Sequence, residues 1–394
     1  MKPTVRRISG HRMHYDWGDL CALHDFCGTN ADGEPLAEIW YGTHRGGPSV
    51  LDDGTFLEDV VSPRRADSRV DGLPYLVKLI APAKPLSIQV HPSREQAEVG
   101  FAVENNLRIP LNAPERTFVD RNHKPEMILA LEPWRALVGF APERELIRFN
   151  EEVGTPLALR IASLLAVKGL ELPVYTVLKR GLHPPVEELL AYVRRCSALK
   201  SHADEAISKR AGMVEFVHSY FPRHTSVLVA ALMNIVDLAP GEALFTPVGT
   251  IHSYLSGVGL EVMASSANTI RAGLTSKHID VEGLLSTAKL YSTPPILVQP
   301  STQRVCRSVV RTYQPAVNDF RLDIADIEDC VVRGVATNDT LLVAIDREAL
   351  VNGMSLPRGE AMWVPASVAF EVSGPARVAL VSTASEPVRW LVED

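Results

Sequence analysis

Two polar residues inside an otherwise apolar segment, 86–92 (LSIQVHP), constrain the fold of this 394-residue chain more than any other feature. The segment has the composition of a short β-strand, in which alternate side chains point to the same face of a sheet. Gln89 and His91 therefore project together, while Ile88 and Val90 point to the other face. Burying Gln and His is costly unless each finds a partner, so polar groups from elsewhere must meet them.

Two candidates for those polar groups lie far away in the sequence. Glu126 begins the apolar run 127–131 (MILAL), and His252 follows a turn-rich segment that leads into another short strand. Two imidazoles, a carboxylate and an amide oxygen suit Zn²⁺, with room left for water or substrate. One cation would serve all the buried groups at once. The sequence thus predicts one zinc ion per chain, with four ligands: Gln89, His91, Glu126 and His252.

The order of strand-like and helical segments predicts the architecture. Residues 1–141 and 236–299 contain short strands broken by Gly, Pro and Asp, residues 142–235 are helical in pattern, and residues 300–394 are again strand-rich. Since the predicted ligands lie on both sides of the helical part, the first β-domain must be built from discontinuous sequence. We predict a mainly β protein with a jelly-roll β-sandwich, a helical insertion and a second, smaller C-terminal β-domain.

Helix ends can be predicted within the helical part. Thr155 followed by Pro156 predicts a helix start, and Gly169 predicts its end. Ser201 and Asp204 have the spacing of a capping box. The apolar residues that follow recur at three- and four-residue steps and predict one buried helix face. These residues are Ile207, Ala211, Val214, Val217 and Phe221.

Composition and charge exclude several classes of function. Lys and Arg number 40 against 47 Asp and Glu, a net charge of −7, and no stretch concentrates enough basic residues for a nucleic-acid or membrane surface. The chain has no run of about eighteen apolar residues and no apolar signal-peptide core. Its five cysteines form no C-x-x-C pair, which argues against a disulfide framework and a thiolate zinc site. We predict a cytoplasmic protein; a monomer is compatible with the sequence, which does not fix the oligomeric state.

Charged residues beside the predicted ligands suggest a reaction centre. Arg271 and Lys277 follow a strand that begins soon after His252, so both are expected to face the metal pocket. An arginine there suits an anionic substrate or a developing oxyanion. A surface position is the alternative for any loop arginine, but apolar Ile270 before it and the Ala-Gly pair after it favour a packed loop.

The segment that leads into Glu126 carries two more candidates. Lys124 precedes Pro125, which biases it to an extended conformation. In an extended chain Lys124 lies two residues from Glu126 and points to the same side. His123 is then expected to face away from the metal.

Six segments together resemble the type I mannose-6-phosphate isomerases (phosphomannose isomerases), zinc enzymes of the cupin superfamily. The resemblance runs nearly end to end, and in the fourth segment Phe118 stands shortly before the motif where the family has Tyr. The segments are 15–18 (YDWG), 38–44 (EIWYGTH), 83–92 (AKPLSIQVHP), 120–126 (DRNHKPE), 252–257 (HSYLSG) and 271–277 (RAGLTSK).

The resemblance implies a cupin-type fold in both β-domains and the interconversion of mannose 6-phosphate and fructose 6-phosphate through a cis-enediol. It assigns zinc to the same four ligands. It also implies catalytic positions at Arg271, Lys124, His123 and Glu261, without deciding between His123 and Lys124 for proton transfer. Its substrate-binding positions are Ser87 and Lys78 at the phosphate end, Tyr254 and Lys277.

Two departures from the family pattern leave other functions open. Ala267 stands where the family has Asp, and Ser276 stands where it has Pro. The first removes a carboxylate from the pocket and raises three alternatives: a paralogue that isomerises a different sugar or sugar phosphate, a sugar-binding cupin without catalysis, and a cupin-type iron oxygenase. Two His and a carboxylate also suit Fe(II), but the Gln ligand and the Arg and Lys lining argue against the oxygenase.

Overall fold

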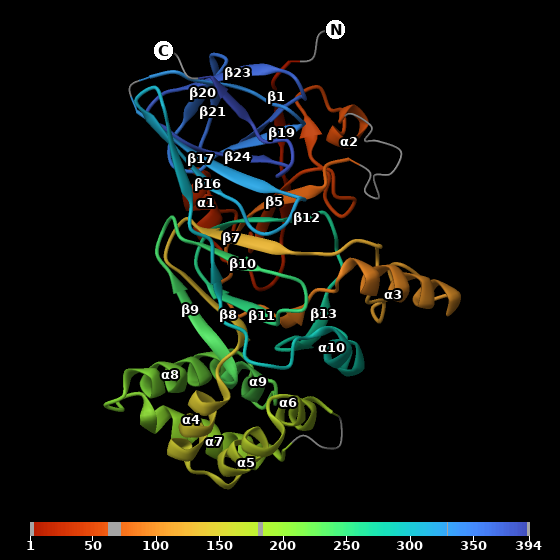
Figure 1. Cartoon of the computed structure of the whole chain (residues 1–394), viewed down its shortest axis with the longest axis vertical. Coiled ribbons are helices and arrows are strands. Elements are labelled where there is room, and N and C mark those ends of the chain that lie inside the picture. Colours follow the sequence, from red (N-terminus) through yellow and green to blue (C-terminus); the bar gives the residue numbers. More distant parts are fainter. Residues whose placement is uncertain (1–3, 62–71, 180–183, 329, 392–394) are drawn as a thin grey trace.

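The structure is a computed structural model, and it describes residues 4–61, 72–179, 184–328 and 330–391. Strands dominate it and form four sheets, and a group of helices lies at one end of the molecule (Figure 1). No helix in the described ranges is long and apolar enough to cross a membrane. The prediction of a mainly β protein that contains several helices is confirmed.

Two antiparallel sheets form the middle of the molecule and carry the predicted ligands. The seven-stranded sheet has the order β14 (Ile296–Leu297), β10 (Ala243–Thr246), β7 (Glu126–Ala130), β12 (Gly259–Ala264), β5 (Tyr75–Ile80), β3 (Glu38–Tyr41) and β2 (His11–Met13). The five-stranded sheet has the order β13 (Ile270–Gly273), β6 (Ile88–Val90), β11 (His252–Ser256), β8 (Trp134–Phe140) and β9 (Met233–Leu238). Strands from before and after the helical segment thus pair with each other in both sheets.

Two further sheets contain most of the C-terminal strands. The eight-stranded sheet has the order β15 (Ser301–Val305), β16 (Ser308–Tyr313), β17 (Arg321–Ile327), β24 (Ala376–Ser382), β19 (Thr340–Ala344), β22 (Ala361–Val364), β1 (Arg6–Ser9) and β4 (Val50–Leu51). The outer sheet has the order β21 (Met354–Leu356), β20 (Ala349–Val351), β23 (Ala369–Ser373), β18 (Val332–Val335) and β25 (Arg389–Leu391). The N-terminal strands β1 and β4 therefore complete a sheet of C-terminal strands.

The helices lie mainly in one stretch of sequence between β8 and β9. They are α4 (Glu143–Val153), α5 (Pro156–Lys168), α6 (Glu171–Leu178), α7 (Val186–Leu199), α8 (Glu205–Tyr220) and α9 (Val227–Ala231). Outside this stretch lie α1 (Ala22–Cys27), α2 (Leu57–Val60), α3 (Arg94–Asn106) and α10 (Val281–Thr287). In Figure 1 the helical stretch and the C-terminal strands occupy opposite ends of the molecule.

Buried apolar clusters define the order of the layers. Phe149 and Val214 of the helices pack with Ile88 and Leu255 of the five-stranded sheet. The other face of that sheet packs on the seven-stranded sheet through a second cluster that includes Trp134. A third cluster joins the seven- and eight-stranded sheets, and a fourth joins the eight-stranded sheet to the outer one. The middle sheets therefore face each other, and the site lies between them.

The predicted strands are present with small shifts at their ends. The run from Met127 forms β7, which begins one residue earlier, at Glu126. The segment around Gln89 forms the short strand β6, and His91 lies directly after it. The C-terminal runs at 341–345, 361–364 and 377–381 correspond to β19, β22 and β24.

The predicted helix ends are partly correct. Thr155 caps α5 by accepting the backbone N–H of Ala158, and the helix ends at Gly169 as predicted. The capping box of Ser201 and Asp204 is wrong, because Asp204 is itself the N-cap of α8 and its carboxylate accepts the first backbone N–H groups. A carboxylate at this position both bonds those donors and complements the helix dipole, so it displaces the weaker hydroxyl cap.

Candidate active site

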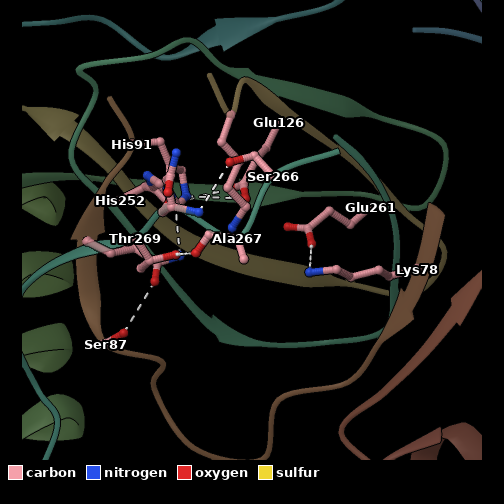
Figure 2. Close-up of polar contacts among 12 residues, drawn as sticks. Lys78, Ser87, His91, Glu126, His252, Glu261, Ser266, Ala267 and Thr269 are labelled. Carbon is pink, nitrogen blue, oxygen red and sulfur yellow. Dashed lines mark hydrogen bonds and ion pairs between the residues drawn. The ribbon is translucent and has the colours of Figure 1, made fainter. Parts of the chain in front are cut away.

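Three of the predicted ligands meet between the two middle sheets. His91 directly follows β6, Glu126 begins β7 and His252 begins β11. Nε2 of His91 lies 3.2 Å from Oε1 of Glu126, and Nε2 of His252 lies 3.2 Å from Oε2 of the same carboxylate. All three side chains are buried, and one donor atom from each lies within 4.8 Å of the others (Figure 2).

Hydrogen bonds on the far side of each imidazole fix which ring nitrogen faces the cluster. Nδ1 of His91 lies 2.7 Å from the carbonyl oxygen of Asn268, and Nδ1 of His252 lies 3.0 Å from that of Thr250. A carbonyl only accepts, so each Nδ1 carries a proton and each Nε2 is the ring nitrogen that faces the cluster. Burial, together with the ammonium of Lys124, lowers the pKa of His91 to about 3, so the ring is neutral near pH 7.

The cluster fits a divalent cation such as zinc. Nε2 of His91 and Oε2 of Glu126 are buried and have no hydrogen-bond partner within the described part of the chain. Buried polar atoms are ordinarily partnered, and three lone-pair donors that face one another repel unless a cation lies between them. Neutral imidazoles and an ionised carboxylate are also the forms that bind zinc.

Gln89 lies beside the cluster at the centre of β6. It is directly opposite His252 on one neighbouring strand and Arg271 on the other. Ile88 and Val90 are buried in the helix-facing core, as the alternation of the strand predicts. Nε2 of Gln89 lies 3.3 Å from Nε2 of His252, and a half-turn of the amide would place Oε1 toward the cluster.

Lys124 contacts the ligand carboxylate directly. Its Nζ lies 2.9 Å from Oε1 of Glu126, on the side that the extended chain predicts. Burial opposes the ionisation of Glu126, but the adjacent ammonium of Lys124 favours it, and the pKa of this carboxyl lies well below its usual range. The cluster therefore combines a metal-ligating carboxylate with a cation held at its edge.

A second buried group of charges lies farther along the same face of the seven-stranded sheet. Nζ of Lys78 lies 3.0 Å from Oε2 of Glu261 and 3.5 Å from Oε1 of Glu38 (Figure 2 labels the Lys78–Glu261 pair). Trp40 donates its indole N–H to Glu38 at 2.7 Å. Burial raises the pKa of Glu261, and the two carboxylates raise the pKa of Lys78 against the opposing effect of its burial. Lys78 is thus already paired with negative charge.

Both groups open onto one cavity of about 730 Å³. The alternation within β3, β5 and β12 places polar residues on its wall and their apolar neighbours in the core behind. Seven predicted site residues outside the metal cluster line it: Ser87, Lys78, Lys124, Tyr254, Glu261, Arg271 and Lys277. A cavity of this size, with apolar walls and a few convergent polar groups, is typical of a small-molecule site.

Ala267 lies in a loop that Asp120 holds in place. The carboxylate of Asp120 accepts the hydroxyl of Ser266 at 2.9 Å, the backbone N–H of Ala267 at 2.8 Å and the side-chain amide of Asn268 at 3.1 Å. Asn268 in turn holds His91 through its carbonyl. Ala267 is exposed and lines the cavity beside this network (Figure 2 labels Ala267).

Arg271 and Lys277 form a positively charged part of the cavity wall. Burial and the neighbouring Arg271 lower the pKa of Lys277. Nζ of Lys277 lies 5.5 Å from the centre of the Tyr15 ring. Within the described residues, neither cation has a carboxylate oxygen within ion-pair distance. Two adjacent cations without a paired carboxylate suit an anionic ligand.

His123 points away from this cavity, as predicted. Its Nε2 lies 2.9 Å from Oδ2 of Asp319 and faces a second cavity, which Arg94 also lines. The structure therefore does not bring His123 to the metal cluster, although its chain neighbour Lys124 touches Glu126. His123 and Lys124, the two alternatives for proton transfer that the resemblance implies, therefore lie in different cavities.

Several cavity residues were not predicted from the sequence. Glu38, Trp40 and His44 come from one segment, 38–44, where their even spacing puts them on one face of an extended chain, and this spacing was a usable signal. Burial lowers the pKa of His44 to about 4. Tyr220, Phe221 and His224 come from the helical stretch and gave no signal, since nothing local to them indicates a distant cavity.

Known proteins resemble this chain in sequence and in structure. The family model described as phosphomannose isomerase type I, catalytic domain, matches residues 5–143. The mannose-6-phosphate isomerase of Escherichia coli (strain K12) is 31% identical over 409 residues, covering 96% of this chain and 99% of the relative. The human mannose-6-phosphate isomerase is 30% identical over 356 residues, 81% of each chain.

Solved structures give the same likeness. A mannose 6-phosphate isomerase from Salmonella typhimurium, bound to its substrate fructose 6-phosphate and to zinc, aligns with a TM-score of 0.84 and 28% identity over 96% of this chain and 99% of its own. A zinc-bound mannose 6-phosphate isomerase aligns with a TM-score of 0.85 and 29% identity over the same shares.

Proposed function

Because the chain belongs to the type I phosphomannose isomerase family, we propose that it is a zinc-dependent isomerase that interconverts mannose 6-phosphate and fructose 6-phosphate. One observation carries the proposal: a buried cluster of His91, Glu126 and His252, with Lys124 beside its carboxylate, opens onto a cavity whose wall carries Arg271 and Lys277. Metal-ligating chemistry and unpaired positive charge in one cavity suit a substrate that has both hydroxyl or carbonyl oxygens and a phosphate.

The reaction moves a proton between C1 and C2 of the sugar through a cis-enediol. We propose Gln89, His91, Glu126 and His252 as the zinc ligands. Zinc bound there would polarise the oxygens on C1 and C2 as a Lewis acid.

The protein's own residues would stabilise the charge and carry the proton. Lys124 and Arg271 face the reacting end from two sides and can stabilise the negative charge that builds on the enediol oxygens. Glu261 is our candidate for proton transfer, because burial raises its pKa toward the range that general acid–base catalysis requires. His123 is left out of this assignment because it faces the second cavity.

The phosphate end of the sugar would lie toward the positively charged wall. Lys277 and Ser87 are the proposed phosphate contacts, and Tyr254 a proposed contact of the sugar. Lys78 lines the same cavity but is flanked by Glu38 and Glu261, so we assign it a role in holding these carboxylates in place.

We propose the finer organisation on the same basis. Residues 1–141 and 236–299 would form a catalytic jelly-roll domain of cupin type, residues 142–235 a helical domain and residues 300–394 a second cupin-like domain. Two facing antiparallel sheets that enclose the site support the jelly-roll assignment. The cytoplasmic location and the lack of nucleic-acid and membrane partners stay predictions of the sequence, and a monomer is compatible with it.

Metal analysis combined with a direct assay tests the function. The purified protein is expected to contain one zinc ion per chain and to convert mannose 6-phosphate to fructose 6-phosphate, with activity lost after chelation and restored by added zinc. A panel of other sugar phosphates, assayed in parallel, gives the specificity. A zinc-loaded protein that converts another sugar phosphate and leaves mannose 6-phosphate untouched would refute the proposed substrate.

A further inference from the structure

A serine–histidine pair from the helical stretch contacts the cavity wall. Ser226 and His224 lie in the turn between α8 and α9, and the Ser226 side chain is fully buried. Oγ of Ser226 lies 2.6 Å from Nδ1 of His224 and accepts the backbone N–H of Leu274 at 2.9 Å. The backbone N–H of Ser226 also points to Nδ1 of His224, at 3.4 Å. Nδ1 is therefore an acceptor, and the Ser226 hydroxyl donates its proton to it.

The residues held by this pair directly follow the strand that carries Arg271. Leu274 has a φ of 53°, a left-handed conformation that non-glycine residues rarely adopt without support. Gly273 lies so close to the turn that a Cβ there would be 2.2 Å from Cβ of Ser226. His224 also hydrogen-bonds the backbone of Thr275. Three consecutive residues of the loop thus contact two residues of the helical stretch.

The loop connects the two cations of the cavity wall. Arg271 lies within β13 and is held by pairing with β6, whereas Lys277 lies beyond the held residues and has no strand to position it. His224 itself lines the same cavity as both cations. Displacement of the loop would therefore move Lys277 more than Arg271.

We propose that His224 and Ser226 form a clamp that positions Lys277 for the phosphate of the substrate, so that the helical stretch sets the affinity for the phosphorylated sugar. The inference rests on the proposed isomerase function and extends it to residues outside the sheets. His224 and Ser226 are positioning residues, since they act through the loop. The clamp accounts for the buried hydroxyl, the unusual Leu274 conformation and the close approach at Gly273.

Three variants test the roles of His224 and Ser226 in the clamp. His224→Leu and Ser226→Ala remove the contact between His224 and Ser226 and are expected to raise KM for mannose 6-phosphate about threefold to tenfold, as the loss of one hydrogen bond predicts. We expect kcat and zinc content to stay within about twofold of wild type. His224→Asn keeps an acceptor at the Nδ1 position and should restore KM to within about twofold.

Binding of inorganic phosphate, measured by calorimetry and as competitive inhibition, should weaken in parallel with KM. Ser163→Ala is the matched control, because its hydroxyl also bonds a helix backbone group, at 2.9 Å, but lies outside the cavity. An unchanged KM and phosphate affinity in His224→Leu, or a fall in kcat alone, would overturn the clamp. If the wild type does not convert mannose 6-phosphate, the proposed function fails, and phosphate calorimetry still decides on the clamp.

Discussion

The inner and outer parts of the cavity are built in different ways. At the inner part, His91, Glu126 and His252 lie on or beside paired strands, and charges are matched: Lys124 contacts Glu126, and Lys78 lies between two carboxylates. At the outer part, Arg271 and Lys277 are adjacent cations without a paired carboxylate in the described chain, and a loop carries one of them.

This difference indicates a division of labour. Sheet register holds side chains in fixed positions, which suits a metal centre that must be preorganised. A loop with unmatched charge suits an anion that arrives and leaves with each turnover. Changes at the inner part should therefore affect metal content and kcat, and changes at Lys277 should affect KM. Arg271 belongs to the outer part but is held by strand pairing beside Gln89, so it is expected to affect kcat.

The largest effect is expected at the metal cluster. His252→Ala removes one ligand and should reduce zinc to a small fraction of one ion per chain. We expect kcat to fall at least about 10³-fold, since loss of a Lewis acid removes several kcal/mol of stabilisation and each 1.36 kcal/mol is a factor of ten. Elemental analysis and the isomerase assay measure both quantities. Full zinc retention in this variant would contradict the ligand assignment.

Substitution of Arg271 tests whether this residue acts in catalysis or in substrate binding. Arg271→Ala should lower kcat on the order of 10²–10³-fold with zinc retained, because one preorganised charge partner of the enediol oxygens is lost. Arg271→Lys should restore only part of the rate, since a point charge lacks the guanidinium fork. A kcat near that of wild type in Arg271→Ala, at normal zinc content, would contradict a role of Arg271 in stabilising the enediol oxygens.

Lys277 belongs to the outer part alone. Lys277→Ala should raise KM about 10- to 100-fold, as expected for the loss of a hydrogen bond to a charged group, with kcat within about twofold. Lys168→Ala, at an exposed position of α5, is the control. Steady-state kinetics on mannose 6-phosphate distinguish the outcomes, and an unchanged KM would remove Lys277 from the phosphate site.

The smallest effect is expected at Ala267. Ala267→Asp adds a carboxylate to the wall that also carries Arg271 and Lys277, and should raise KM for the phosphorylated sugar by no more than about fivefold, the range for partly exposed charge pairs. Kinetics of both proteins on mannose 6-phosphate and on other sugar phosphates provide the measurement. A gain of activity on mannose 6-phosphate, with loss of another substrate, would instead make Ala267 a determinant of specificity.

The sequence predicted what depends on short-range geometry. Gln89 and His91 share a face because side chains alternate along any strand, and Lys124 points with Glu126 for the same reason. The inclusion of His252 in the ligand set rested on its donor chemistry and on the family resemblance, since no local rule joins strands across a helical stretch. The Glu38–Lys78 pair and the Ser226–Leu274 contact could not be predicted, because each depends on how distant segments pack.

The pairing of β1 has a consequence for the order in which the chain can fold. One edge of β1 pairs with the nearby strand β4, but the other edge, where Arg6 is directly opposite Trp363, has no partner until nearly all of the chain has left the ribosome. Such non-local pairings form slowly, and an unpaired strand edge can associate with other chains in the meantime. Shortening the protein from its C-terminal side would therefore leave β1 exposed at the opposite end of the sequence and favour aggregation, even with every residue of the cavity intact.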